Sequence, residues 1–173
     1  MLHLTPADYR TMPWANGRGQ TVELFREDRD GGLLYRLSMA LVTEDGPFSL
    51  LPGIERVLTV ISGPGFELEG EGLHLEARPL MPVAFAGDIP IRATGVTAPS
   101  EDFNVMTARN LPLPEVRMVR DYHLAEGGLL GIFALGPLTV NGSRLALHDL
   151  ALTRGDARVK GGADAIAVRI FET

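Results

Sequence analysis

The sequence of 173 residues contains no cysteine, which excludes disulfides, thiolate metal ligands and a cysteine nucleophile. The same absence fits a reducing compartment. Clusters of basic residues are also missing, and the formal net charge at pH 7 is −6, so the surface would repel the phosphates of a nucleic acid. We therefore expect no nucleic-acid partner.

Long apolar runs are missing as well. No segment approaches the roughly 20 residues that a membrane-spanning helix needs. The first residues lack the basic region followed by an apolar stretch that is typical of a secretory signal. The sequence thus predicts a cytoplasmic protein without a membrane partner.

Familiar catalytic and metal-binding motifs do not occur either. The four histidines, at positions 3, 74, 123 and 148, form no His-x-His pair and no His-Glu-x-x-His pair. The serines lack the Gly-x-Ser-x-Gly elbow, and the glycine-rich segments 17–19 and 63–65 lack the context of a phosphate-binding loop. We predict no metal site and no cofactor.

Glycine and proline are plentiful, with 20 and 12 residues, and they interrupt the chain too often for long helices. The apolar segments between these breaks are short and often alternate with polar residues, which predicts an all-β protein. We expect a helical turn near residues 5–11. We expect strands over residues 21–26, 33–43, 54–61, 66–68, 73–75, 82–86, 89–94, 102–109, 116–121, 129–135, 138–140, 144–147, 150–153 and 165–171.

An all-β chain of this strand density must bury one face of each sheet, which favours a jelly roll. The length predicts one compact unit, residues 1–173, with an internal boundary at the proline-rich break at 110–114. Segment 65–75 aligns with segment 137–147 at one constant offset, and Asn141-Gly142 predicts a type I′ hairpin turn. The alignment reflects either a duplicated roll or a general likeness between hairpins.

Two arginines lie on predicted strand faces that are otherwise apolar. Arg36 shares a face with Ser38, and a buried guanidinium needs an acidic partner or an anionic ligand. Arg36 therefore either forms a salt bridge with Glu23 or Asp102, or binds a carboxylate. Arg56 raises the same question, although we expect its side chain to extend to the rim of the fold.

Four further residues could contribute to a binding site. Trp14 could stack on a planar ligand or close one end of a barrel. Asn16 offers a recognition group or a turn residue. Glu23 could act as an acid or base, pair with Arg36 or face water. Asn104 could contact a ligand or brace the backbone.

Residues 12–23, Met-Pro-Trp-Ala-Asn-Gly-Arg-Gly-Gln-Thr-Val-Glu, begin a series of motifs that continues at 36–38, 46–53 and 102–106. In order and spacing this series resembles the HutD/Ves family of the cupin superfamily, which is linked to histidine utilisation. The resemblance covers residues 12–109 and departs from the family at Arg18, where a glycine is usual. It implies a bicupin without the usual cupin metal.

The implied bicupin consists of two fused jelly-roll-like β-rolls, residues 1–110 with the family motifs and residues 111–173. The resemblance implies a metal-independent protein that binds a small carboxylate and regulates histidine utilisation by sensing or sequestering an intermediate such as formylglutamate or urocanate. The candidate ligand-binding residues are Trp14, Asn16, Glu23, Arg36, Ser38, Arg56 and Asn104.

Two other hypotheses stay open. The first is a metal-independent cupin isomerase, lyase or hydrolase that acts on a small carboxylate, with Glu23 as general base and Arg36 stabilising negative charge. The second is a protein that acts through a protein partner or as a homodimer, because exposed β-edges favour association.

Overall fold

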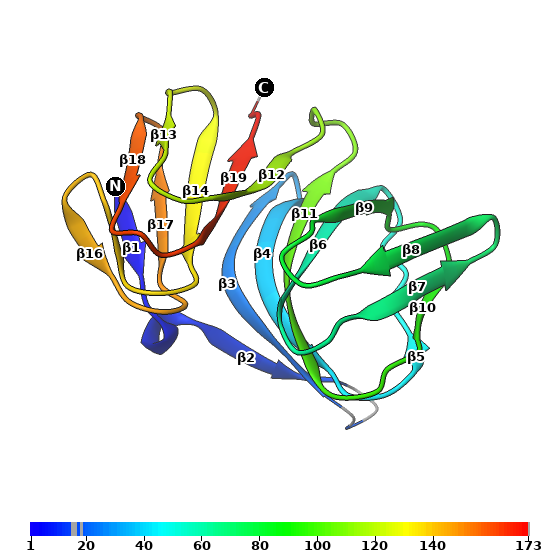
Figure 1. Cartoon of the computed structure of the whole chain (residues 1–173). Coiled ribbons are helices and arrows are strands. Elements are labelled where there is room, and N and C mark those ends of the chain that lie inside the picture. The colour runs from blue at the N-terminus through cyan, green and yellow to red at the C-terminus, as the bar shows by residue number, and fades with distance from the viewer. Residues whose placement is uncertain (15–16, 18, 173) are drawn as a thin grey trace. The chain divides into compact units, whose positions relative to one another are not determined.

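A computed structural model describes residues 1–14, 17 and 19–172 of the chain. The chain is nearly all β, as the sequence predicts, and it divides into two compact units (Figure 1). We call Arg10–Asn110 the central roll, and Met1–Tyr9 together with the chain from Leu111 onward the terminal roll. Within the described part of the chain, no helix has the length and apolarity to span a membrane.

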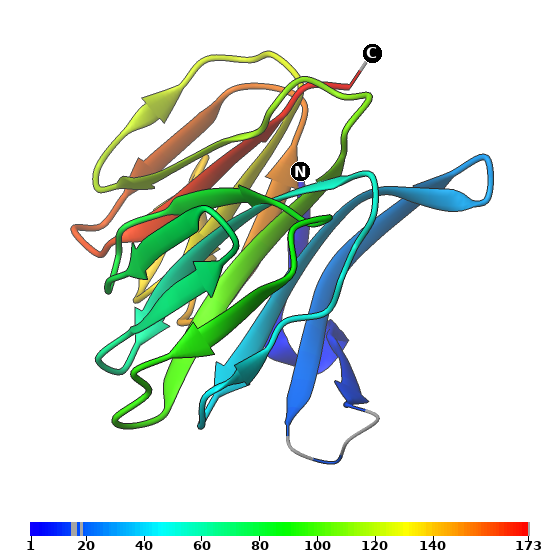
Figure 2. The ribbon, with the colours of Figure 1, turned by 90° about the vertical axis from the view of Figure 1, so that its right-hand side faces the viewer.

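The central roll consists of two sheets. The larger sheet has the spatial order β2 (Arg10–Pro13), β3 (Gln20–Arg29), β4 (Gly32–Val42), β11 (Ser100–Ala108), β6 (Ile54–Ser62) and β9 (Val83–Ala86). The smaller sheet has the order β5 (Gly46–Pro47), β10 (Ile91–Thr94), β7 (Phe66–Gly70) and β8 (Leu73–Ala77). Apolar side chains of both sheets, including Leu58, Leu68 and Ile91, form one core. The β3–β4 hairpin extends beyond the rest of its sheet (Figure 2).

The terminal roll also consists of two sheets. One has the order β1 (Leu2–Leu4), β17 (Leu150–Thr153), β14 (Leu129–Ala134), β19 (Ala165–Ile170) and β12 (Glu115–Val119). The other has the order β13 (His123–Leu124), β18 (Ala157–Lys160), β15 (Leu138–Val140) and β16 (Ser143–Leu145). The core of this roll contains many small side chains, among them Ala134, Ala165 and Ala167.

The same strand order occurs twice. Strands β12 to β19 pair in the same pattern as strands β4 to β11. In this correspondence β12 takes the place of β4, β13 that of β5, and so on in chain order up to β19, which takes the place of β11. The hairpins β7–β8 and β15–β16, whose segments align in the sequence, hold corresponding places in the two rolls. Asn141 and Gly142 both have positive φ, as the predicted type I′ turn requires. The topology therefore supports a duplicated β-roll over a chance likeness between hairpins.

The first nine residues correct the sequence-based division at 110. They belong to the terminal roll rather than to a roll of residues 1–110, because β1 pairs antiparallel with β17. His3 also contacts Asp149 at 2.8 Å, and the Tyr9 hydroxyl donates to the His148 carbonyl at 2.6 Å. The expected helical turn near 5–11 is the 3-10 turn η1 (Pro6–Asp8), after which the chain is extended again in β2.

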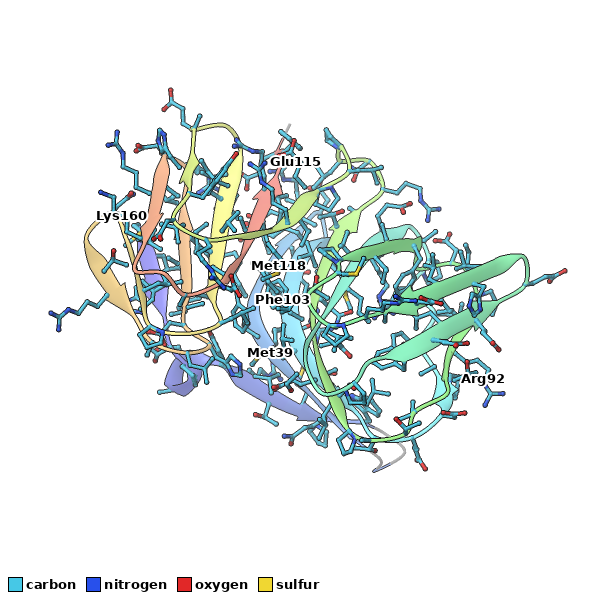
Figure 3. The ribbon with its side chains drawn as sticks, viewed as in Figure 1. Met39, Arg92, Phe103, Glu115, Met118 and Lys160 are labelled. Atoms are coloured by element: carbon cyan, nitrogen blue, oxygen red, sulfur yellow. The ribbon has the colours of Figure 1, made fainter. Side chains whose placement is uncertain are left out.

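Five short strands, β1, β2, β5, β13 and β18, were absent from the predicted set. Strand β18 does alternate, with Ala157 and Val159 buried and Arg158 and Lys160 exposed. Lys160 extends from the end of this strand in Figure 3. Four residues between turn glycines give too short a pattern to separate a strand from a loop.

Candidate functional site

The central roll contains a cavity of about 390 Å³. The cavity is bounded by the inner face of the larger sheet and by the segment 47–51. The side chains around it combine apolar groups with a few charged and polar ones. Its lining residues are Trp14, Thr21, Arg36, Ser38, Ala40, Val42, Pro47, Phe48, Ser49, Leu51, Arg56, Asp102, Asn104 and Met106. Small-molecule sites in proteins have this composition.

Strand alternation explains which residues face the cavity. On β4, Arg36 and Ser38 lie on one face, and on β11 the residues opposite them are Met106 and Asn104. The partners Met39 and Phe103 on the same two strands lie on the other face of the sheet (Figure 3). The predicted shared face of Arg36 and Ser38 is therefore present in the structure.

Arg56 on β6 is the most buried cation at the cavity, with 6% of its surface exposed. Its guanidinium carbon lies 5.3 Å from the ring centre of Phe48 and 5.1 Å from that of Phe85, within the range of cation–π attraction. Burial lowers the pKa of Arg56 to about 10, while the Asp102 charge opposes this shift. The expectation that Arg56 extends to the rim is wrong, because the two aromatic rings hold its head group inside the roll.

Asn104 connects Arg56 to a buried carboxyl group. Its Oδ1 accepts a hydrogen bond from Arg56 Nη2 at 3.1 Å, and its Nδ2 donates to Asp102 Oδ1. Asp102 is 1% exposed, and burial raises its pKa to about 7, although the hydrogen bond from Asn104 and the charge of Arg56 act in the opposite direction. Asn104 thus contacts side chains rather than bracing the backbone.

Arg36 forms a salt bridge with Glu23, which was one of the two interpretations that the sequence left open. Arg36 Nε lies 2.9 Å from Glu23 Oε2, and both side chains are largely buried. The contact is therefore a salt bridge between two largely buried charges. Burial lowers the pKa of Arg36, and the Glu23 charge acts against that change. Arg36 nevertheless lines the cavity, whereas Glu23 is not among its lining residues.

Trp14 lies at the cavity with a fixed orientation. Its indole Nε1 donates to Thr21 Oγ1 at 2.9 Å, and its backbone N–H donates to the Gly19 carbonyl at 2.9 Å. A Cβ on Gly19 would lie 2.7 Å from Trp14 Cζ3, so the ring packs directly on the glycine backbone. The predicted site residue Asn16 and the departure at Arg18 lie outside the described residues.

The segment 47–51 closes one side of the cavity and was not among the predicted site residues. The Phe48 N–H donates to the Ile91 carbonyl at 2.9 Å, and the Leu51 N–H donates to the Gly87 carbonyl at 2.8 Å. Asp102, Met106 and Thr21 also line the cavity without having been predicted to do so. Asp102 and Met106 could have been found, because they alternate with Asn104 along the same predicted strand.

The terminal roll shows that this fold does not need polar residues at these positions. In the sheet order of the terminal roll, β19 holds the place of β11 and β14 that of β6, and these strands contribute Ala165, Ala167 and Leu130 to the interior. These alanines and the leucine are part of an apolar core. The interior of the central roll is therefore more polar than that of the terminal roll.

Two features elsewhere offer weaker candidates. Glu67, Glu69 and His74 hold ligand atoms within 4.8 Å of one another and could contact a metal ion, but all three are exposed on the β7–β8 hairpin. A shallow hollow of about 580 Å³ on the terminal roll includes His123 and Arg158. Both of these side chains already contact Asp156, at 3.1 Å and 3.3 Å.

Curated proteins of similar sequence cover part of the chain. The chain is 37% identical over 110 residues to an uncharacterized 21.2 kDa protein in the hutC 3' region of Pseudomonas putida, covering 61% of this chain and 57% of that protein. It is 37% identical over 119 residues to protein Ves of Citrobacter koseri, covering 64% of this chain and 61% of that protein. The chain thus spans about three fifths of the length of these curated relatives.

Solved structures extend the similarity to the whole chain. HutD from Pseudomonas fluorescens SBW25, determined in a formate condition, is 30% identical over 99% of both chains, with a TM-score of 0.87. A cupin 2 conserved barrel domain protein from Leptotrichia buccalis, 6% identical with a TM-score of 0.59 over 87% of this chain and 88% of that one, shares the fold alone. The family model described as HutD matches residues 6–169. The chain therefore belongs to the HutD family, which is associated with histidine utilisation and has a cupin-like all-β fold.

Proposed function

We propose that the central roll binds a small carboxylate without a metal ion, and that the protein regulates histidine utilisation by sensing or sequestering a pathway intermediate such as formylglutamate or urocanate. One observation carries the proposal: Arg56, a cation with 6% exposure, lines a cavity and has an amide rather than a carboxylate as its hydrogen-bond partner. A guanidinium that is buried beside a void is well suited to bind an anion.

The size of the cavity supports a small ligand. A volume of about 390 Å³ lies in the lower part of the range of small-molecule pockets. Phe48 and Trp14 provide aromatic surface, and Ser38 and Asn104 provide neutral polar groups. A charged hydrogen bond contributes roughly 1.5 to 3 kcal/mol, so one or two such bonds with ring contacts would support affinities of about micromolar.

Family membership supports the pathway. Formylglutamate and urocanate both carry carboxylates, so each could use Arg56 as an anchor, with the aromatic residues against the rest of the molecule. Arg36 has a smaller part in this proposal than the sequence indicated, because Glu23 already compensates its charge at 2.9 Å.

Calorimetric titration tests the proposal. The protein is titrated with urocanate, formylglutamate, formiminoglutamate and histidine, and we expect saturable binding of at least one of them. In Arg56→Gln that binding should weaken about 10- to 100-fold, whereas Arg92→Gln, a change on the exposed face of β10, should leave it unchanged. Absence of binding by all four compounds would defeat the pathway assignment.

The enzyme hypothesis with Glu23 as general base has less support. Glu23 is engaged with Arg36 and does not line the cavity, so a bound substrate would not reach its carboxylate directly. Prolonged incubation of each candidate compound with excess protein decides between the two functions. Turnover that is lost in Glu23→Gln while binding persists would establish the enzyme, and unchanged compound would support binding alone.

A further inference from the structure

Asp102 occupies an unusual position for a carboxyl group. It lines the cavity, yet 1% of its surface is exposed. Its Oδ1 accepts the hydrogen bond from Asn104, while Oδ2 has no hydrogen-bond partner in the described part of the chain. The corresponding strand of the terminal roll, β19, contributes Ala165 and Ala167 to an apolar core, so the topology does not require a carboxyl group on this strand.

Every element around Asp102 contributes to its electrostatic surroundings. Arg56 on β6 is connected to Asp102 through Asn104, and its positive charge lowers the pKa of Asp102. Arg36 lies on β4, and its positive charge is compensated by the negative charge of Glu23 on β3. Glu101 precedes Asp102 on β11 and adds a negative charge. The smaller sheet contributes apolar side chains to this interior, namely Phe66, Leu68, Leu73, Leu75, Ala77, Ile91 and Ala93.

A carboxylate that binds beside Arg56 would create a second negative charge in the same enclosed space. Two carboxylates that share one cation in a low-dielectric site do not both stay ionised at neutral pH, because their repulsion raises the pKa of the more basic group. Burial already raises the pKa of Asp102 to about 7. A bound anion would raise the pKa of Asp102 further.

We infer that Asp102 takes up a proton when a carboxylate binds beside Arg56, so that the site binds the anion together with one proton. The inference rests on the proposed function. The ionised Asp102, the ligand carboxylate and one proton from solvent give a protonated Asp102 and an ionised ligand. One O–H bond forms at Asp102, and no bond of the ligand breaks. The new O–H group can donate a hydrogen bond to the anion.

This makes Asp102 the residue that determines which ligands the site accepts at a given pH. An anion without hydrogen-bond donors enters only with the proton. A ligand whose N–H group pairs with ionised Asp102 would enter without one. Acetate, which has no N–H group and stays ionised above about pH 5.5, therefore isolates the effect of Asp102.

Trp14 provides the readout, because it is the single tryptophan and it lines the cavity. The protein is titrated with acetate at several pH values from about 5.5 to about 8.5, and binding is followed by the change in Trp14 fluorescence. In the unmodified protein we expect a dissociation constant that is nearly constant below about pH 7 and rises about tenfold per pH unit above it. Asp102→Asn should remove this dependence and bind acetate more tightly than the unmodified protein at about pH 8.5.

Asp149→Asn is the matched control, since Asp149 is a buried carboxyl group that lies in the terminal roll and does not line the cavity. It should follow the pH dependence of the unmodified protein. If Asp102→Asn does not fold, calorimetry of the unmodified protein at about pH 8 in buffers of different ionisation enthalpy decides, with an expected uptake of about one proton per acetate.

The outcomes separate the two proposals. Binding of acetate with the same affinity at every pH, or without proton uptake, overturns the inference and leaves carboxylate binding intact. Failure to bind acetate or any of the four pathway compounds at any pH contradicts the proposed function itself, and the inference with it.

Discussion

Arg56 donates a hydrogen bond from Nη2 to Asn104 Oδ1 over 3.1 Å, so an amide rather than a carboxylate holds this buried guanidinium. The arrangement leaves the positive charge of Arg56 only partly compensated at the wall of the cavity. Asp102, the nearest acid in the network, is reached through the same amide and has a raised pKa. The central roll therefore keeps a cation available for an anionic ligand.

Replacing Asn104 by leucine should destabilise the protein. The substitution keeps a similar volume but removes the hydrogen bonds to Arg56 and Asp102, which leaves two buried polar groups without this partner. Such groups cost about 1 to 3 kcal/mol each. For the two groups together, urea unfolding should show a loss of about 2 to 6 kcal/mol.

Ser38→Ala is the control for Asn104→Leu. Ser38 lines the same cavity, and its hydroxyl bonds to no other residue of the described chain, so we expect a change below about 0.5 kcal/mol. Equal losses in the two variants would show that the network around Asn104 has no special energetic role.

Glu23→Gln should strengthen carboxylate binding. The change removes the negative charge that lies 2.9 Å from Arg36 Nε, and it leaves the guanidinium at the cavity wall with an uncompensated charge. We expect an increase in affinity for formylglutamate of about three- to tenfold by calorimetry. Glu115→Gln, which removes an ion pair with Arg169 in the terminal roll, should have no such effect. Weaker binding in Glu23→Gln would indicate that Glu23 contacts the ligand.

Asp102 should make the stability of the ligand-free protein depend on pH. Its pKa in the folded state is about 7 against an ordinary value of 3.8, so the folded state binds more protons than the unfolded state between these values. The free energy of unfolding should therefore fall as pH rises from about 4 to about 7, by up to about 4 kcal/mol. Unfolding experiments at about pH 5 and about pH 8 measure the loss.

Asp102→Asn should lose this contribution and should be more stable than the unmodified protein at about pH 8. Asp149→Asn serves again as control, because the Asp149 carboxylate accepts a hydrogen bond from the Ala146 N–H and contacts His3. Parallel stability curves for the unmodified protein and Asp102→Asn would contradict the raised pKa.

Gly19→Ala should displace Trp14. The new methyl group would lie 2.7 Å from the indole ring, too close for either group to stay in place. We expect a shift in tryptophan fluorescence and weaker ligand binding, because Trp14 forms part of the cavity wall. Gly46→Ala is the matched control, since a methyl group there meets no atom within 4 Å. An unchanged emission spectrum in Gly19→Ala would show that the ring has room to move.

Much of the central roll could be predicted from the sequence. Strands β4 and β11 each span nine or more residues, and residues two apart on a strand share a face, so the shared face of Arg36 and Ser38 and the position of Asn104 follow from a period of two. The pairing of Arg36 with Glu23 was one of two proposed outcomes, because an inward guanidinium on this strand has few acidic partners within reach. Local periodicity was sufficient for these features.

Other features depend on contacts that no local pattern contains. Alternation assigns Arg56 to the inner face, but only the three-dimensional structure shows that Phe48 and Phe85 surround its head group and prevent it from reaching the rim. The pairing of β1 with β17 joins segments about 150 residues apart, so nothing near Leu2–Leu4 indicates it. The segment 47–51 lies against the cavity through backbone hydrogen bonds, which side-chain patterns do not encode.

The most direct measurement is a crystal structure of the protein with formylglutamate. We expect one carboxylate of the ligand within about 3 Å of the Arg56 guanidinium, inside the cavity of the central roll. A ligand bound at another surface, or an empty cavity at concentrations that saturate binding in solution, would contradict the account.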